Sequence, residues 1–184
     1  PFERLTEGLP RVVRDISVRS KKEVELKIQG ADIRLDRSIL EGIASPLVHI
    51  IRNSVDHGIE DISERRKLGK PASGAVSVRV CGKKDRVVVE VTDDGRGIDV
   101  EKVKAKAAAT GFLTEEKLKA MPRKDALMLI CLPGLSTTTE VSDTSGRGVG
   151  MDVVKSSVEA LGGSLSIDSK PGKSTRIKME LPRT

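Results

Sequence analysis

Helical and alternating hydrophobic spacings divide the 184-residue chain into separate segments. Apolar residues at helical spacing follow Asp36, a residue type that caps helix starts, and predict a helix extending to about His57. Pro46 interrupts this pattern and predicts either a kink or two abutting helices. Gly58 then fits the glycine that follows a helix end. A second helical stripe begins at Met151 and ends before two consecutive glycines.

Alternating apolar residues predict strands in two further regions of the chain. Valines at positions 76, 78 and 80 and the run Val87–Val91 predict an antiparallel pair joined by the charged turn Gly82–Arg86. A second hairpin is expected around Lys170–Lys173. Another strand, Val24–Ile28, follows a charged helical segment at residues 3–19 that is interrupted near Pro10. These elements predict one α/β (α+β) two-layer sandwich over residues 1–184, with helices on one face of a mixed, mainly antiparallel sheet.

The region between these halves, residues 99–145, has a weaker pattern. It is rich in Lys, Thr and Gly, and it contains short helical pieces without a strong core stripe. A long insert of this kind is usually functional or mobile. We therefore expect residues from about 108 to 145 to be poorly packed, and to become ordered when a ligand contacts them.

Composition narrows the possible partners. The formal charge is +6, the chain has two Phe and no Tyr or Trp, and 37% of its residues are hydrophobic. Without aromatic platforms the basic surplus indicates anionic ligands in general and is weak evidence for nucleic-acid binding. No apolar run approaches the roughly 20 residues of a membrane span, and residues 1–10 lack a signal-peptide core, so we expect neither membrane insertion nor secretion.

One polar stripe lies on the first long helix. His49, Asn53 and His57 are spaced by four residues, so each side chain is displaced by only about 40° from the one before it. Ile50 and Ile51 then point toward the core. An imidazole and an amide oxygen aligned in this way can meet a phosphate and its metal, although a polar, solvated helix face is the alternative.

Two glycine-containing segments are further candidates. The valine strand ends in Asp93, which could accept a hydrogen bond from an exocyclic amine such as that of adenine, and glycines follow it; the alternative is a common Asp-Gly turn. Further along, alternate glycines at 146, 148 and 150 lead directly into a helix. Free N–H groups at a helix start suit a polyphosphate, and the alternative is a flexible loop. The run 172–175, Gly-Lys-Ser-Thr, lacks the first glycine of a P-loop and indicates only a turn.

In this order, the segments resemble the ATP-binding boxes of the GHKL superfamily: the N box, two glycine boxes and a closing Gly-x-x-Thr. The finer similarity is to CheA-type chemotaxis histidine kinases, carried by His-Ile-Ile-Arg-Asn-Ser-Val-Asp-His-Gly-Ile-Glu, Asp-Asp-Gly-Arg-Gly-Ile-Asp and Ser-Gly-Arg-Gly-Val-Gly-Met-Asp-Val-Val. It extends over almost the whole chain. The resemblance implies a Bergerat-type fold with a mobile ATP lid near 108–145, and a cytoplasmic location.

The resemblance also implies a role for each matching residue. Asn53 would coordinate Mg²⁺ that bridges the phosphates of ATP, and Asp93 would bind the adenine amine. His49, where many relatives carry glutamate, would lie near the γ-phosphate, with His57 one turn further along. Gly95, Gly97 and Thr175 would complete the adenine pocket, and Gly146, Gly148 and Gly150 would hold the phosphates. Further phosphate contacts would be Ser136, Thr137, Lys102 and Lys106, although a solvated helix face also explains the two lysines.

Two positions depart from the family pattern. Leu135 stands where the family usually has Phe, which could loosen the docking of the lid. Ser174 stands where the last box usually has glycine, which puts a tight backbone approach there in doubt.

The expected reaction is transfer of the γ-phosphoryl group of Mg-ATP to a histidine on a separate phosphoacceptor domain. Dimerisation and regulatory domains, chemoreceptors, adaptor proteins and response regulators would be the partners of such a kinase. One alternative is an ATP-hydrolysing clamp like gyrase, Hsp90 or MutL, which activates water with an N-box glutamate where this chain has His49. Another is a nucleotide-binding module without catalysis, against which the intact Asn53, Asp93 and glycine boxes argue.

Overall fold

A five-stranded sheet forms the centre of the protein in a computed structural model that describes residues 1–135 and 150–184. In this sheet the strand order is β1-β2-β3-β5-β4, in which β1 pairs parallel with β2 and all other neighbours are antiparallel. The predicted mixed, mainly antiparallel sheet is confirmed. The strands are β1 (Val24–Gln29), β2 (Gly74–Gly82), β3 (Arg86–Asp93), β4 (Ser164–Lys170) and β5 (Ser174–Pro182).

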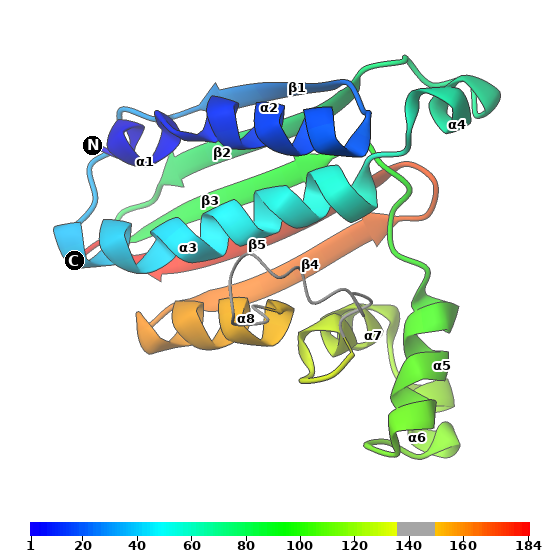
Figure 1. The fold of residues 1–184 in the computed structure, drawn as a ribbon. Coiled ribbons are helices and arrows are strands. Elements are labelled where there is room, and N and C mark those ends of the chain that lie inside the picture. Colours follow the sequence, from blue (N-terminus) through cyan, green and yellow to red (C-terminus); the bar gives the residue numbers. More distant parts are fainter. Residues whose placement is uncertain (136–149) are drawn as a thin grey trace.

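Three amphipathic helices cover one face of the sheet (Figure 1): α2 (Leu9–Ser20), α3 (Arg37–Asn53) and α8 (Met151–Ala160). This arrangement confirms the two-layer α+β sandwich. Figure 1 also shows α5 to α7 grouped at one end of the helical layer. The shorter elements are α1 (Glu3–Thr6), the π-helical turn η1 (Ser54–Gly58), α4 (Ile62–Lys67), α5 (Val100–Thr110), α6 (Glu115–Ala120), α7 (Arg123–Met128) and the 3₁₀ turn η2 (Leu129–Cys131).

The core lies between the sheet and this helical layer. Alternate residues of β3 and β5 are fully buried there, among them Val89 and Met179, and they belong to one cluster with Ile43, Leu47 and Ile50 of α3. The strand alternation seen in the sequence therefore identifies the inward face, because successive side chains of a strand point to opposite sides of the sheet. Within the described residues, no helix is both long and apolar enough to cross a bilayer.

Helix α3 is one continuous helix, so of the two alternatives predicted for Pro46, a kink or two abutting helices, the second is wrong. Asp36 caps it as expected, accepting a hydrogen bond from the backbone N–H of Ser38 at 2.8 Å. Pro46 lies inside the helix and is buried. Its ring removes one backbone hydrogen bond, but the apolar face around it packs on the sheet, and such packing supplies most of the stability of a helix in a protein.

The helices after β3 are packed more closely than the sequence pattern predicts. Leu118, Leu127 and Leu135 are each at most 4% exposed. These three side chains attach residues 118–135 to the core, and the expected ordering of residues 108–145 by a ligand stays a prediction. Each short helix contributes only one or two buried side chains, and this is too few to form a periodic stripe. The burial of Leu135 also provides an apolar contact at the position where the family pattern has Phe.

Candidate nucleotide-binding site

A row of inward-facing polar side chains lies at one end of the sheet, where the apolar core ends. Asp93 continues the inward alternation of β3, and Thr175 does the same on β5. The two residues are paired across the strands. Ser169 is the next neighbour, paired with Thr175 from β4, and it is 4% exposed. Asp93 and Thr175, which the family resemblance assigns to one adenine pocket, therefore lie side by side on the same surface of the sheet.

Asp93 is almost completely buried, with 3% of its surface exposed. Its Oδ1 accepts a hydrogen bond from the backbone N–H of Gly95 at 2.9 Å. Burial raises the pKa of this carboxyl to about 6, against the smaller lowering effects of hydrogen bonds from Gly95 and Ser54. When it is ionised, a carboxylate screened from water in this way is a strong acceptor for a polar hydrogen of a ligand that reaches it.

The first two residues of the predicted helical stripe do meet. Asn53 Nδ2 lies 3.2 Å from Nε2 of His49, one turn earlier on α3. Burial, together with the nearby charge of Arg52, lowers the pKa of the His49 imidazole. The neutral ring can therefore accept from the Asn53 amide, which leaves the amide oxygen of Asn53 available to a ligand.

The third residue, His57, does not continue the α-helical geometry on which the stripe was predicted. The chain changes after Asn53 to the wider π-helical turn η1, and His57 is exposed. Gly58 also differs from the prediction, because its φ is not in the left-handed range. A Cβ atom on Gly58 would instead lie 3.0 Å from the Asp93 carboxylate. The absence of a side chain at Gly58 therefore lets the end of the N box pack against Asp93.

The glycines after Asp93 are required by close contacts within the chain itself. A Cβ atom on Gly95 would lie 2.0 Å from the carbonyl oxygen of Gly58, and one on Gly97 would lie 2.5 Å from that of Lys170. Gly97 also has a φ of +72°. These two residues thus join the glycine box to the end of the N box and to the β4–β5 turn.

Ser169 is a residue that the sequence analysis missed. Its hydroxyl accepts from the backbone N–H of Ile98 at 2.8 Å and donates to the carbonyl oxygen of Ser174 at 2.9 Å. It therefore ties the last hairpin to the segment after the glycine box. The alternation of Leu165 and Ile167 was the signal that could have identified it as inward-facing. Ser174 itself has no left-handed φ, so a side chain fits where the family pattern has glycine.

A network of four charged residues, two of them with fully buried side chains, lies behind the glycine box, and sequence reasoning missed it as well. Arg65 and Glu60 have fully buried side chains and form an ion pair of 3.1 Å. Arg65 also contacts the Asp94 carboxylate at 3.0 Å, and Lys70 contacts Glu60 at 2.6 Å. The two positive and two negative charges balance, as burial of charge requires.

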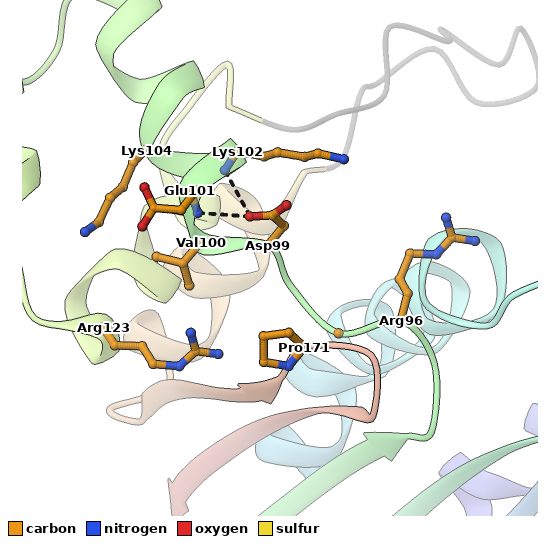
Figure 2. A pocket seen from close by; sticks show the side chains of 9 residues that line it. Arg96, Asp99, Val100, Glu101, Lys102, Lys104, Arg123 and Pro171 are labelled. Atoms are coloured by element: carbon orange, nitrogen blue, oxygen red, sulfur yellow. Dashed lines mark hydrogen bonds between the residues drawn. The ribbon is translucent and has the colours of Figure 1, made fainter. Parts of the chain in front are cut away.

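An open cleft of about 580 Å³ borders the outer side of this region (Figure 2). Asp93, Asn53 and Thr175 do not line it, so this cleft is distinct from the buried polar row at the sheet end. Asp99 caps α5 there, accepting from the backbone N–H groups of Glu101 and Lys102. Basic side chains outnumber acidic ones in the lining, which consists of Arg96, Gly97, Asp99, Val100, Glu101, Lys102, Lys104, Arg123 and Pro171.

The remaining predicted phosphate contacts are only partly described by the structure. Gly150 is the N-cap residue of α8, which packs beside α3. Lys102 and Lys106 are exposed on α5, and Figure 2 shows Lys102 pointing away from Lys104. Ser136, Thr137, Gly146 and Gly148 lie outside the described residues.

Curated relatives match the chain over its whole length. It is 45% identical to a sensor histidine kinase CheAY of Helicobacter pylori and 43% identical to a chemotaxis protein CheA of Halobacterium salinarum, in each case over 184 residues. These alignments cover 100% of this chain, which spans only 23% and 28% of those two relatives.

Solved structures show the same fold at low sequence identity. A blue-light activated histidine kinase of Erythrobacter litoralis superposes with a TM-score of 0.58 at 17% identity, covering 97% of this chain and 42% of that one. The family model described as histidine kinase-, DNA gyrase B- and HSP90-like ATPase matches residues 42–184, which include all the candidate site residues discussed above. The polar row, the pair formed by Asn53 and His49, and the glycine box all lie within this matched region. The chain therefore belongs to the histidine kinase-, DNA gyrase B- and HSP90-like ATPase family.

Proposed function

We propose that this chain binds Mg-ATP and transfers the γ-phosphoryl group to a histidine on a separate phosphoacceptor domain, as the ATP-binding domain of a chemotaxis kinase. The observation that carries the proposal is the convergence of three family motifs at one sheet end. Buried Asp93 lies across from Thr175 and against Gly58, at the end of the helix that bears Asn53. The relatives named CheAY and CheA support the kinase reading within this family.

Asp93 would recognise the adenine base. Its ionised carboxylate can accept from the exocyclic amine, while Gly95 N–H holds Oδ1 in place. Desolvation makes this interaction strong because water does not compete with the base at a site that is 3% exposed. Thr175, on the adjacent strand, would complete the polar edge of the base pocket.

The residues also fit a magnesium ion that is bound mainly through the nucleotide. Mg²⁺ prefers oxygen ligands and usually keeps waters and substrate phosphates in its shell, with one or two protein ligands. Asn53 offers such an oxygen, since its amide nitrogen is engaged by His49. Among the described residues, no cluster of three or more His, Cys, Asp or Glu side chains could hold a metal without a substrate. When bound, Mg²⁺ would neutralise phosphate charge.

Phosphoryl transfer to an imidazole needs positioning and charge neutralisation more than a strong base. The first turn of α8, which follows the N-cap residue Gly150, has backbone N–H groups that can face phosphate oxygens. Lys102 and Lys106 would add positive charge. His49 and His57 would lie beside the nucleotide and would not serve as acceptors.

Clamp-type hydrolysis is less consistent with the site. The ATPases of this kind activate water with an N-box glutamate, whereas this chain has His49, whose pKa is lowered by burial and which is therefore a weaker base than an exposed imidazole. Its Nε2 already accepts from Asn53. We therefore expect slow hydrolysis in the absence of a phosphoacceptor.

The partners and the location belong to the same proposal. The chain would act with phosphoacceptor, dimerisation and regulatory domains, and through them with chemoreceptors, adaptor proteins and response regulators in the cytoplasm. No direct contact with nucleic acid or membrane is proposed.

The test combines this chain with a separately prepared CheA-type phosphoacceptor domain and ATP labelled at the γ-phosphate. We expect label in the acceptor that is stable to base and labile to acid, as phosphohistidine is, and that requires Mg²⁺. Asn53→Ala should abolish transfer. Calorimetric titration of ATP with Mg²⁺ or with EDTA measures binding on the same samples. Tight ATP binding without any phosphohistidine would favour a non-catalytic module, and brisk hydrolysis by the chain alone would favour the clamp.

A further inference from the structure

Lys70 uses all three of its ammonium N–H donors inside the protein. They meet Glu60 Oε2 at 2.6 Å, the carbonyl oxygen of Asp94 at 3.1 Å and that of Gly95 at 2.9 Å. An ammonium group has three donors, so Lys70 is fully engaged. Only 17% of its side chain is exposed. Such a group holds two consecutive carbonyl oxygens of the glycine box in fixed directions.

Arg65 holds the same segment from a second side. Its guanidinium donates to the carbonyl oxygen of Asp94 at 3.3 Å and to Asp94 Oδ2 at 3.0 Å. It also donates to the carbonyl oxygen of Pro71 at 2.6 Å and to Glu60 at 3.1 Å. Asp94 Oδ1 accepts from the backbone N–H of Ala75, at the start of β2. The turn after Asp93 is therefore attached to a fully buried cation and to the sheet.

These contacts determine where two backbone N–H groups point. In a trans peptide, the C=O and the following N–H point to opposite sides. With the Asp94 carbonyl held by Lys70 and Arg65, the N–H of Gly95 points the other way and donates to Asp93 Oδ1. With the Gly95 carbonyl held by Lys70, the N–H of Arg96 points to the carbonyl oxygen of Gly58 at 2.9 Å.

From this geometry we infer that Lys70 and Arg65 are positioning residues for base recognition: they orient the two peptide planes that aim the Asp93 carboxylate and join the glycine box to the end of the N box. Neither side chain touches the base in this arrangement. The inference rests on the proposed function, since it assigns to Asp93 the task of binding adenine. It also assigns a role to the segment from α4 to β2, which lies outside all of the nucleotide-binding motifs.

The experiment compares Lys70→Met with the native chain for binding of ATP and of GTP. GTP carries a carbonyl oxygen where ATP carries the amine that Asp93 would accept from, so it reports binding without this contact. We expect ATP affinity to fall about tenfold, the usual scale of losing a buried hydrogen-bonded charge, with GTP affinity changed less than about twofold. Lys67→Met, at an exposed lysine of α4, is the matched control and should change neither.

A double-mutant cycle with Asp93→Asn tests whether Lys70 affects ATP binding through Asp93. If Lys70 acts through Asp93, Lys70→Met should have almost no further effect on ATP binding in the Asp93→Asn background. An equal loss for both nucleotides, an unchanged ATP affinity or additive effects in the cycle would each overturn the inference. Should Lys70→Met not fold, Lys70→Arg keeps the charge but cannot place three donors on the same oxygens, and it should give the same selective loss to a smaller degree.

A readout without nucleotide separates this inference from the proposed function. Amide hydrogen exchange at Gly95 and Arg96 should accelerate in Lys70→Met, while amides in the β4–β5 pair keep their native rates. Native protein that binds no ATP, or binds it as well after Asp93→Asn, would contradict the proposed function. Unchanged exchange at Gly95 and Arg96 would instead overturn the positioning by Lys70, whatever the chain binds.

Discussion

Ligand binding and burial place opposite demands on the Asp93 carboxyl: a ligand needs its negative charge, and the surrounding core disfavours that charge. Its inward position follows from strand alternation, and its hydrogen bond from Gly95 only partly offsets the desolvation. The pKa of about 6 places this conflict near neutral pH. Two predictions follow at the scale of this residue.

The first prediction concerns nucleotide affinity as a function of pH. Protonated Asp93 is a weaker acceptor for the adenine amine than the ionised carboxylate, so ATP affinity should fall as pH decreases through about 6. Calorimetric titrations between pH 5 and pH 8 measure this. Asp93→Asn should bind ATP weakly and show no step in this range. A native affinity that is constant down to pH 5 would contradict the assignment of Asp93.

The second prediction concerns stability. The pKa of Asp93 is raised in the folded state, so the folded state binds the Asp93 proton more tightly than the unfolded state does. The stabilisation that this proton provides is fully present below about pH 4 and is lost as pH rises through about 6. A rise of this size corresponds to roughly 3 kcal/mol of destabilisation at pH 7.5, as an order of magnitude. Asp93→Asn should therefore unfold at a higher temperature than the native chain at pH 7.5, with the difference shrinking toward pH 4.5. Thermal unfolding at both pH values tests it, and a less stable variant at pH 7.5 would argue against the burial cost.

At the scale of elements, the junction between α3 and η1 depends on a residue from another part of the chain. Lys22, in the connection from α2 to β1, donates to the carbonyl oxygens of Val55 at 2.8 Å and Asp56 at 2.7 Å. Burial lowers the pKa of Lys22, and the charge of Asp56 acts against that effect. The wider turn that presents Gly58 to Asp93 is therefore supported by the N-terminal helix pair.

Lys22→Met should destabilise the chain, because two buried carbonyl groups of η1 would lose their charged donor. We expect a loss of about 1–3 kcal/mol in the free energy of unfolding. Lys27→Met, at an exposed residue of the neighbouring strand β1, should change it by less than about 0.5 kcal/mol. Urea unfolding of the two variants provides the comparison. Equal stabilities would mean that η1 forms without Lys22.

At the scale of the whole molecule, the short helices after β3 belong to the packed body. Arg123, at the start of α7, donates to the backbone carbonyl of Ser169 at 2.7 Å, and Leu127 is 2% exposed. A region that was expected to order only with ligand is thus attached to strand β4 and to the core.

The corresponding prediction is that backbone amides of α7 are protected without nucleotide. Hydrogen exchange of the nucleotide-free chain should show protection at Leu127 and Met128 comparable to that of α8, and Mg-ATP should increase it less than tenfold. Arg123→Ala should reduce this protection. Rapid exchange throughout α7 in the free chain would instead support the expectation of a poorly packed segment.

Local patterns allowed much of this protein to be predicted. The period-two spacing located β2, β3 and the C-terminal hairpin, whereas only the family resemblance linked Asp93 to Thr175, which pairs with it across the sheet. The cap at Asp36 and the helical stripes gave α3 and α8. The order of the nucleotide-binding motifs indicated the family that the comparison identified. The strands, the helices and the cap depend on residues within a few positions of one another, and each motif is a short run of residues, which is why the sequence alone determined them.

Other features were decided only by the tertiary structure. The π-helical turn at His57, the contact of Gly95 with Gly58 and the burial of Ser169 depend on how distant segments pack. The charged network joins Arg65 to Asp94 across 29 positions, and no periodicity in the chain relates them. An ion pair between residues so far apart forms only where the folded path of the backbone brings them together, so its existence cannot be deduced from the spacing of its residues.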